Sequence, residues 1–216
     1  MARVLIHACP AREWYVYDYL MPSLLTQGVQ DVSVWLDSKG AGCLESFVAS
    51  CEAIGDEGGT WHLQDDVIIS ADFHKKITEY DDGIACGYAN PNFGPFMDAT
   101  GRQPVVFMWY SFPCTRIPNS YAKAFAAWYR SYAQTSLRYE NYVRRCKGDD
   151  TLFREWLIEA HPHDWVVNLK PNLVDHIDFL LGGSTVNKHR VIPSRAFYFT
   201  DRHLVDALAD QLATRA

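Results

Sequence analysis

Two adjacent carboxylates interrupt an otherwise apolar, strand-like stretch at residues 61–70, WHLQDDVIIS. Aspartate is a poor strand former, and Asp65 and Asp66 repel each other, so the pair gives a strand little structural benefit. If the pair is buried, a divalent cation would offset the repulsion, because carboxylate oxygens are its preferred ligands. Alternatively, both residues end the strand and accept hydrogen bonds in a turn. Because consecutive strand residues point in opposite directions, we expect one carboxylate to face a ligand.

Two further segments carry polar side chains that could act beside this pair. Asp149 and Asp150 come just before a predicted helix, where an N-cap needs one carboxylate and the second is left over. His176 lies in an apolar stretch next to Leu173 and Ile177. A histidine in such surroundings is more often a core residue than a ligand.

The elements that must position these residues alternate between strand and helix in the first third of the chain. We expect strands at residues 3–8, 32–36 and 61–69, and helices at residues 14–25 and 43–54. This alternation is typical of a parallel α/β sheet, whose ligands bind at the carboxyl ends of the strands. The ends of the first two strands therefore supply four more candidates, Ala8, Pro10, Arg12 and Asp37, although both segments could also be ordinary turns.

The remainder of the chain completes one predicted domain over residues 1–216. Short strands are expected at residues 84–88 and 105–109, and helices at residues 121–132, 152–160 and 201–215. Residues 89–102 form a loop rich in glycine, proline and asparagine that could serve as a lid. The predicted fold class is therefore α/β, with a central, mostly parallel sheet flanked by helices.

Composition excludes several classes of protein. A hydrophobic content of 48% in 216 residues is enough for a full core, whereas the net charge of −6 disfavours general nucleic-acid binding. None of the six cysteines forms a C-x-x-C pair, so a zinc ribbon or dithiol redox site is not expected. No stretch approaches the ~20 apolar residues of a membrane span, and the apolar run at the N-terminus is too short for a secretory signal. We expect a soluble, cytoplasmic protein.

The order of the motifs resembles that of the GT-A glycosyltransferases. Residues 63–67, LQDDV, resemble the LEDDV form of their acidic motif, and residues 170–184, KPNLVDHIDFLLGGS, resemble their P-x-L-x-x-H-x-x-x-x-S segment. The resemblance implies that Asp66 binds a divalent metal, Mn²⁺ or Mg²⁺, which bridges the diphosphate of a nucleotide-sugar, that Asp65 lies near the ribose, and that His176 is a metal or diphosphate ligand. Gln64 departs from the motif, since it replaces an acid with a neutral amide, which puts strict metal dependence in question.

The same resemblance assigns roles to the other candidates. An acidic residue at a helix start is the general base of inverting members, which points to Asp150, with Asp149 as the second choice. Residues 108–123 resemble the acceptor-side loop and following helix, so Arg116 and the loop at residues 111–114 would contact sugar or phosphate. The alternative for residues 108–123 is an ordinary turn and helix start, in which Arg116 is a solvated charge. Residues 1–88 would form the nucleotide-binding half and residues 89–216 the acceptor-side half. The nucleotide pocket would contain Ala8, Pro10, Arg12 and Asp37, with Asp37 on a ribose or base edge.

The resemblance implies a glycosyltransferase that moves a sugar from a nucleoside diphosphate-sugar donor to an acceptor hydroxyl. A nucleotidyltransferase-like enzyme is one alternative, although residues 7–14, HACPAREW, lack the basic, glycine-rich phosphate loop expected after its first strand. A non-catalytic sugar-nucleotide binding module is the other, and Gln64 makes it conceivable. The acceptor stays open among glycan, protein, small molecule and modified nucleobase, as do the donor's base and sugar, the anomeric outcome and the oligomeric state.

Overall fold

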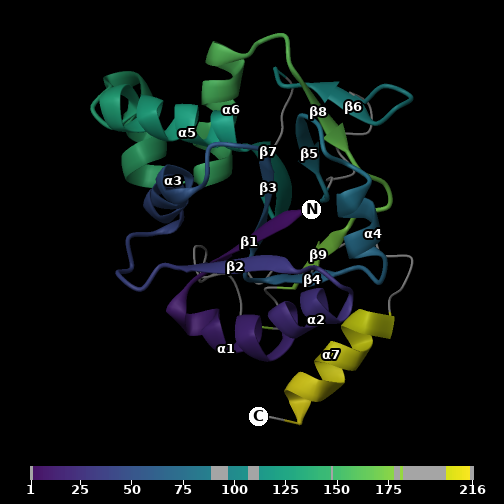
Figure 1. Ribbon diagram of the computed structural model, residues 1–216. Coiled ribbons are helices and arrows are strands. Elements are labelled where there is room, and N and C mark those ends of the chain that lie inside the picture. Colours follow the sequence, from purple (N-terminus) through teal and green to yellow (C-terminus); the bar gives the residue numbers. More distant parts are fainter. Residues whose placement is uncertain are drawn as a thin grey trace.

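A seven-stranded sheet forms the centre of the molecule. The computed structural model describes residues 2–88, 97–106, 112–146, 148–177, 181 and 203–214. The strand order is β2-β1-β3-β7-β5-β8-β6 (Figure 1). The strands are β1 (Arg3–Ala8), β2 (Asp31–Leu36), β3 (Gly59–Gln64), β5 (Ile84–Cys86), β6 (Arg102–Pro104), β7 (Cys114–Pro118) and β8 (Trp165–Asn168).

The directions of the strands confirm the predicted fold class. β1 pairs in parallel with β2 and β3, and β5 pairs in parallel with β8. β7 is inserted antiparallel between β3 and β5, and β6 lies antiparallel along β8. Five of the seven strands therefore run in one direction, which makes the sheet mostly parallel. The carboxyl ends of β1, β2 and β3 consequently meet at one edge.

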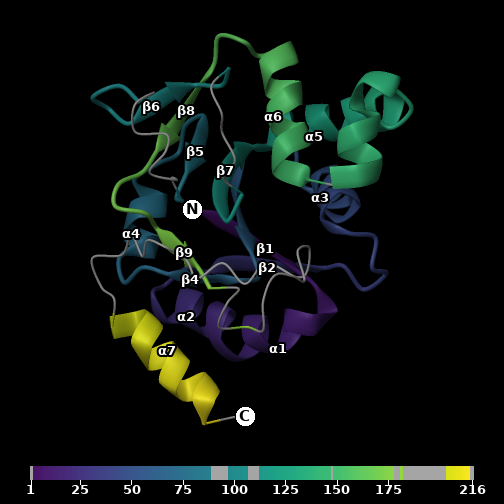
Figure 2. The same ribbon diagram turned by 180° about the vertical axis from the view of Figure 1, so that it is seen from behind.

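Helices cover both faces of this sheet. One face carries α3 (Cys43–Ala53), α5 (Asn119–Trp128) and α6 (Asp149–Ala160), together with the short helical segments η4 (Tyr129–Ala133), η5 (Leu137–Tyr139) and η6 (Asn141–Cys146). The other face carries a continuous helical segment, η1 (Pro10–Arg12), α1 (Glu13–Tyr15), η2 (Val16–Leu20) and α2 (Met21–Thr26), with α4 (Phe73–Thr78) and α7 (His203–Ala213). Figures 1 and 2 show these two groups of helices on opposite sides of the sheet.

Strand alternation divides the apolar side chains between two cores. Val4 and Ile6 of β1, with Trp61 and Leu63 of β3, pack against α1, α2 and α4. Residues of opposite parity on the same strands point to α3, where the ring of Phe47 meets His7 and His62. Each face of the sheet is thus buried against its own helical layer, and most side chains of β1 and β3 are buried, including the polar Thr60 and His62.

A second sheet of two strands brings together segments that are far apart in the sequence. β4 (Val67–Ile69) pairs antiparallel with β9 (Val174–His176), and Val67 lies opposite His176. Figure 2 shows this pair next to α2. The sheet therefore connects the acidic motif to the C-terminal histidine.

The single strand predicted at residues 61–69 is wrong in one respect. β3 ends at Gln64, Asp65 and Asp66 form a turn, and β4 begins at Val67. The two carboxylates therefore do not alternate across a sheet, and the expectation that only one would face inward does not hold. The turn is favoured because it lets both side chains find partners on the segment after β1, as described below.

Elements in the second half differ more from the prediction. β7, β8 and β9 lie in segments where no strand was expected. The strand expected at residues 105–109 is replaced by β6 at Arg102–Pro104, with residues 105–106 in a turn and residues 107–109 outside the described residues. Most of the proposed lid, residues 89–96, also lies outside them, and residues 97–101 form a turn that leads into β6.

Candidate functional site

The site is built around the acidic turn, by which we mean Asp65 and Asp66 between β3 and β4. Both residues are 7% exposed. The backbone amide of Cys9 donates a hydrogen bond to Asp65 Oδ2 at 2.7 Å, and Arg12 Nη1 donates to Asp65 Oδ1 at 3.0 Å. The same Nη1 atom makes a short charge-assisted hydrogen bond to Asp66 Oδ2. Arg12 is 3% exposed, so one buried guanidinium bridges two buried carboxylates.

Local sequence explains how Arg12 reaches the turn. β1 ends at Ala8, and Pro10 begins a short 3₁₀ helix, Pro10–Arg12, whose last residue is the arginine. Proline suits that first helical position because its fixed φ fits the helix and its missing N–H is not needed there. The carboxyl ends of β1 and β3 are adjacent in the sheet, so the residues that follow them meet.

Charge within the cluster is only partly balanced. Two carboxylates face one guanidinium, which leaves net negative charge at the turn. Burial, together with the charge of Asp66, raises the pKa of Asp65. Burial acts to lower the pKa of Arg12, but the two carboxylates outweigh it and raise that pKa. The positive charge that the sequence led us to expect near the aspartates is therefore supplied, at least in part, by the chain itself.

His176 lies on the other side of Asp66. Its Nε2 atom is 3.4 Å from Asp66 Oδ1, an oxygen that is buried and accepts no hydrogen bond from the residues the structure describes. The β4–β9 pairing fixes this position, because it sets His176 opposite Val67, the residue after the turn. The structure thus brings Arg12, Asp65, Asp66 and His176 together from three separate segments.

Asp149 and Asp150 are the first two residues of α6, and Gly148 is its N-cap. Neither aspartate is therefore the N-cap residue, although both suit the positive end of the helix dipole. Asp150 Oδ1 accepts hydrogen bonds from the backbone amide and the hydroxyl of Thr151, at 2.6 and 3.1 Å. Asp149 Oδ1 accepts one from the amide of Asp150 at 3.0 Å.

Electrostatics single out Asp149 and relate it to the acidic turn. Burial, with the charge of Asp150, raises the pKa of Asp149 to about 7, and the charge of Asp66 adds a smaller contribution in the same direction. Burial also raises the pKa of Asp150. The charge of Asp149 in turn helps to raise the pKa of Cys43 at the start of α3, after burial, the main cause. The effect of Asp66 on the pKa of Asp149 is thus smaller than the effects of burial and of the adjacent Asp150.

The side chains of His7 in β1 and His62 in β3 stay neutral. His7 Nε2 and His62 Nδ1 are 2.8 Å apart, and the two rings stack. Burial lowers the pKa of His7 to about 4, and burial with the neighbouring His7 lowers that of His62 well below its usual value. The pair consequently adds no positive charge to the site at neutral pH.

The other residues predicted at the first two strand ends have structural partners. The carbonyl of Ala8 accepts a hydrogen bond from the amide of Asp37 at 2.9 Å, and Pro10 is exposed at the start of η1. Both carboxylate oxygens of Asp37 accept backbone hydrogen bonds, from Ala41 and Gly42, each at 2.8 Å. Asp37 thus closes the turn before α3, as the ordinary-turn alternative anticipates.

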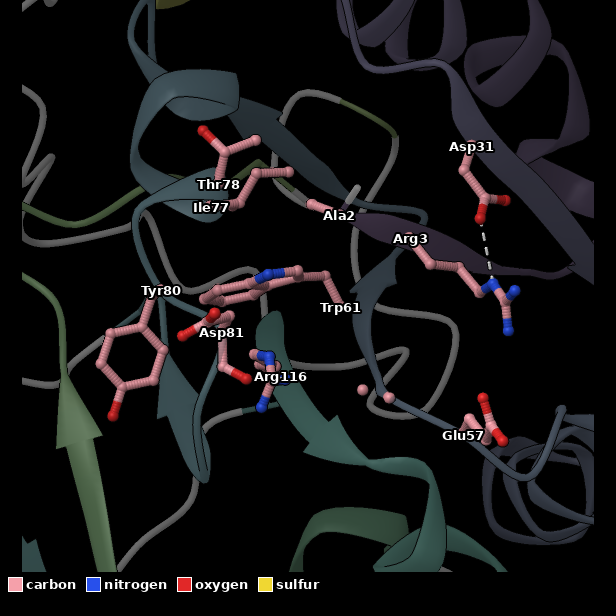
Figure 3. Close-up of a pocket in the computed structure, with 12 residues that line it drawn as sticks. Ala2, Arg3, Asp31, Glu57, Trp61, Ile77, Thr78, Tyr80, Asp81 and Arg116 are labelled. Atoms are coloured by element: carbon pink, nitrogen blue, oxygen red, sulfur yellow. Dashed lines mark hydrogen bonds and ion pairs between the residues drawn. The ribbon is translucent and has the colours of Figure 1, made fainter.

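The structure does not bring Arg116 to the acidic turn. β7 runs antiparallel to β3, which places Arg116 beside Trp61, near the start of β3. Its Nη1 atom donates to the carbonyl of Gly83 at 2.6 Å, and Nη2 donates to the carbonyl of Asp81. Arg116 lines a pocket of about 360 Å³ with Trp61 and Tyr80 at the amino ends of β1 and β3 (Figure 3). The predicted sugar or phosphate contact would therefore lie at the opposite edge of the sheet from the other candidates.

A divalent cation, as implied by the resemblance, would find two donors at the acidic turn, Asp66 Oδ1 and His176 Nε2. Within the described ranges, no group of three or more histidine, cysteine, aspartate or glutamate side chains is arranged to hold a metal. Magnesium is commonly bound through one or two carboxylates plus substrate phosphates, and manganese favours similar oxygen ligands. The residues present therefore fit an ion shared with a diphosphate rather than one held in an all-protein cage.

Beyond the contact of Arg12 with both aspartates, two features of the site were not predicted from the sequence. The amide of Cys9 donates a hydrogen bond to Asp65, and His176 reaches Asp66 through the pairing of β4 with β9. The first has no side-chain signal. The second had one, the apolar residues of the segment around His176, but a strand of three residues is too short to show a clear periodicity.

Comparison with known proteins shows the fold class alone. No protein-family model matches the sequence, and no curated protein matches it. A structure of the glycosyltransferase GlyE from Streptococcus pneumoniae TIGR4 matches 100% of this chain and 64% of its own, with a TM-score of 0.50 and 9% identity. Apo GlyE matches 79% of this chain and 45% of its own, with a TM-score of 0.46 and 10% identity.

A nucleotidyltransferase is also similar. The inositol-1-phosphate CTP transferase of T. maritima matches 78% of this chain and 85% of its own, with a TM-score of 0.41 and 12% identity. The chain spans less than two thirds of the length of the GlyE chains it matches. At this level of identity, the likeness establishes a mixed α/β fold shared with GlyE. Within the described part of the chain, no helix is both long and apolar enough to cross a membrane.

Proposed function

We propose that the chain transfers a glycosyl group from a nucleoside diphosphate-sugar to an acceptor hydroxyl, at the carboxyl ends of β1, β2 and β3. The observation that carries this proposal is the buried cluster that Arg12, Asp65 and Asp66 form beside His176, and the raised pKa of Asp149 supports it. The charge of that cluster is only partly balanced, and the pKa of Asp149 is raised to about 7. A transferase of this kind needs both a site for a leaving diphosphate and a proton acceptor near neutral pKa.

The acidic turn, Arg12 and His176 would form the donor side of the site. Arg12 can offer its guanidinium to the diphosphate, since a planar guanidinium suits phosphate oxygens. Asp66 and His176 would hold the divalent cation. When bound, that cation neutralises charge that develops on the departing diphosphate. Asp65, held by the amide of Cys9 and by Arg12, would position the donor's ribose.

Asp149 would form the acceptor side. In the proposed step, the acceptor oxygen bonds to the anomeric carbon, the bond from that carbon to the diphosphate oxygen breaks, and the electron pair leaves with the diphosphate. The hydroxyl proton passes to the carboxylate of Asp149. We favour Asp149 over Asp150, our first choice from the sequence, because burial raises the pKa of Asp149 to about 7, whereas Asp150 Oδ1 accepts two hydrogen bonds from Thr151.

A donor screen tests the proposal. The protein is incubated with Mn²⁺ and a panel of uridine, guanosine, cytidine, thymidine and adenosine diphosphate-sugars, and release of nucleoside diphosphate is measured with an inactive Asp66→Asn, Asp149→Asn variant as the blank. Release above the blank from at least one donor is expected. Binding of a donor without release would favour a non-catalytic module, and release of pyrophosphate from nucleoside triphosphates with a sugar phosphate would favour a nucleotidyltransferase.

A further inference from the structure

Arg12 occupies one side of the group that would hold the metal. Asp66 has two carboxylate oxygens, and Oδ2 bonds to Arg12 while Oδ1 faces His176. We propose that Arg12 is an internal counter-ion that competes with a divalent cation for Asp66, so that the chain binds metal tightly only when a diphosphate draws Arg12 away. The inference rests on the proposed function for the divalent cation at Asp66 and for the diphosphate that releases Arg12.

Burial makes this competition strong. Arg12 is 3% exposed and each aspartate 7% exposed, so water screens the charges of the cluster poorly. A cation bound at Asp66 Oδ1 would share a carboxylate with the guanidinium. Two positive charges on one buried carboxylate repel each other, and the repulsion lowers the affinity for the metal.

The balance of charge indicates what would relieve the repulsion. The acidic turn and Arg12 together carry one net negative charge, and a divalent cation would reverse its sign. A diphosphate brings negative charge to the same place and gives both the metal and Arg12 a further set of oxygen ligands. Metal and diphosphate should therefore bind with positive coupling, and that coupling is reciprocal.

A purely structural role for Arg12 leads to a different expectation. If Arg12 only ties the segment after β1 to the acidic turn, then its removal loosens the turn, and metal affinity stays the same or falls. If Arg12 competes with the metal, then its removal raises metal affinity even though it costs stability. The sign of the change in metal affinity therefore separates the two roles.

The experiment is equilibrium dialysis of Mn²⁺ against the folded protein without nucleotide. Arg12→Gln should bind Mn²⁺ at least about tenfold more tightly than the unmodified chain. A tenfold change in the dissociation constant is a small change in binding free energy, and removal of the competing charge of Arg12 is enough to supply it. Asp66→Asn added to Arg12→Gln should abolish the gain. Arg3→Gln is the matched control, because Arg3 pairs with Asp31 at 3.1 Å at the other end of β1 and should leave Mn²⁺ affinity unchanged.

A second measurement uses the unmodified chain, in case Arg12→Gln does not fold. Pyrophosphate, added as the base-independent probe, should raise the amount of Mn²⁺ retained by the protein by about tenfold or more. Equal or weaker Mn²⁺ binding by folded Arg12→Gln would overturn the proposal, as would a gain that survives Asp66→Asn or the absence of a pyrophosphate effect. Because no sugar donor is used, these outcomes do not depend on the donor screen, and either proposal can fail alone.

Discussion

At the scale of single residues, a few atoms decide what the site can do. Arg12 Nη1 lies between two buried carboxylates, Asp66 Oδ1 has His176 as its neighbour, and Asp149 has a pKa near neutral. These three properties arise from burial and from charges on different segments. Each can be changed by one substitution, and the consequences differ in kind.

Asp149→Asn should lower the transfer rate by ~10²-fold or more while leaving donor affinity unchanged, because a positioned general base contributes at that scale. Asp150→Asn is the matched control, since the same chemical change one residue along should cost little activity. Rates and donor affinities of both variants would be compared by steady-state kinetics and calorimetry. Loss at Asp150 with normal transfer by Asp149→Asn would move the base to the second residue.

The pKa of Asp149 also predicts a dependence on pH. Transfer should rise with pH through about 7 and level off above it, because the base acts when deprotonated. Stability should change in the opposite sense. An unfolded aspartate has a pKa of about 3.9, so between that value and the raised folded value the native state binds more protons, and stability falls as pH rises.

Urea unfolding at pH 5 and pH 8 measures this effect. The unmodified chain should lose stability between the two values, and Asp149→Asn should lose less, since its side chain does not titrate. An identical loss in both proteins would show that other groups account for the pH dependence.

His176→Ala should weaken Mn²⁺ binding in the presence of pyrophosphate much more than it lowers the melting temperature. The reason is that the imidazole is half-buried at the end of a short strand and its Nε2 atom points to Asp66. Dialysis with Mn²⁺ and a thermal melt give the two quantities. A large fall in melting temperature with unchanged metal binding would make His176 a core residue.

At the scale of elements, the register between strands determines which residues meet. Because β7 runs antiparallel to β3, Arg116 is carried to the amino end of β3, where its guanidinium packs against Gly59. A Cβ atom at Gly59 would lie 2.6 Å from that guanidinium. This contact is remote from the acidic turn, which lies beyond the other end of β3.

Gly59→Ala should therefore destabilise the protein by about 1–3 kcal/mol, as is usual for overpacking, without changing transfer by the folded protein. Gly55→Ala is the control, because a Cβ there would meet Arg3 at an ordinary contact distance of 3.4 Å. Chemical denaturation and initial rates would be measured for both variants. A Gly59→Ala protein of full stability but reduced rate would link the Arg116 pocket to catalysis.

Local sequence patterns predicted some of these elements and missed others. β1, β2 and α3 were located closely, because β1 and β2 are apolar runs bounded by turn residues and α3 has its apolar residues at helical spacing. β7 was missed because Pro113 precedes it, Pro118 is its last residue and proline disfavours strands, so the segment resembled a turn before a helix. Its place in the centre of the sheet depends on pairing with two other strands, which no local pattern encodes.

At the scale of the whole molecule, the sheet separates two edges with different chemistry. The carboxyl edge carries the acidic turn with Arg12 and His176, and the amino edge carries the Arg116 pocket. Candidate residues after β1 and β3 could be grouped from the sequence, since carboxyl ends of parallel strands share an edge. The position of Arg116 could not be predicted because the direction of its strand is set by tertiary pairing, and the Arg12 contact was not foreseen because it joins side chains 53 and 54 residues apart.

The most direct test is a crystal structure of the chain with Mn²⁺ and the nucleoside diphosphate released from its preferred donor, in which anomalous scattering locates the manganese. We predict that the ion lies between Asp66 and His176, with the diphosphate in contact with Arg12. A diphosphate bound in the pocket of Arg116, Trp61 and Tyr80, with no ion at Asp66, would contradict the assignment of the site to the carboxyl edge of the sheet.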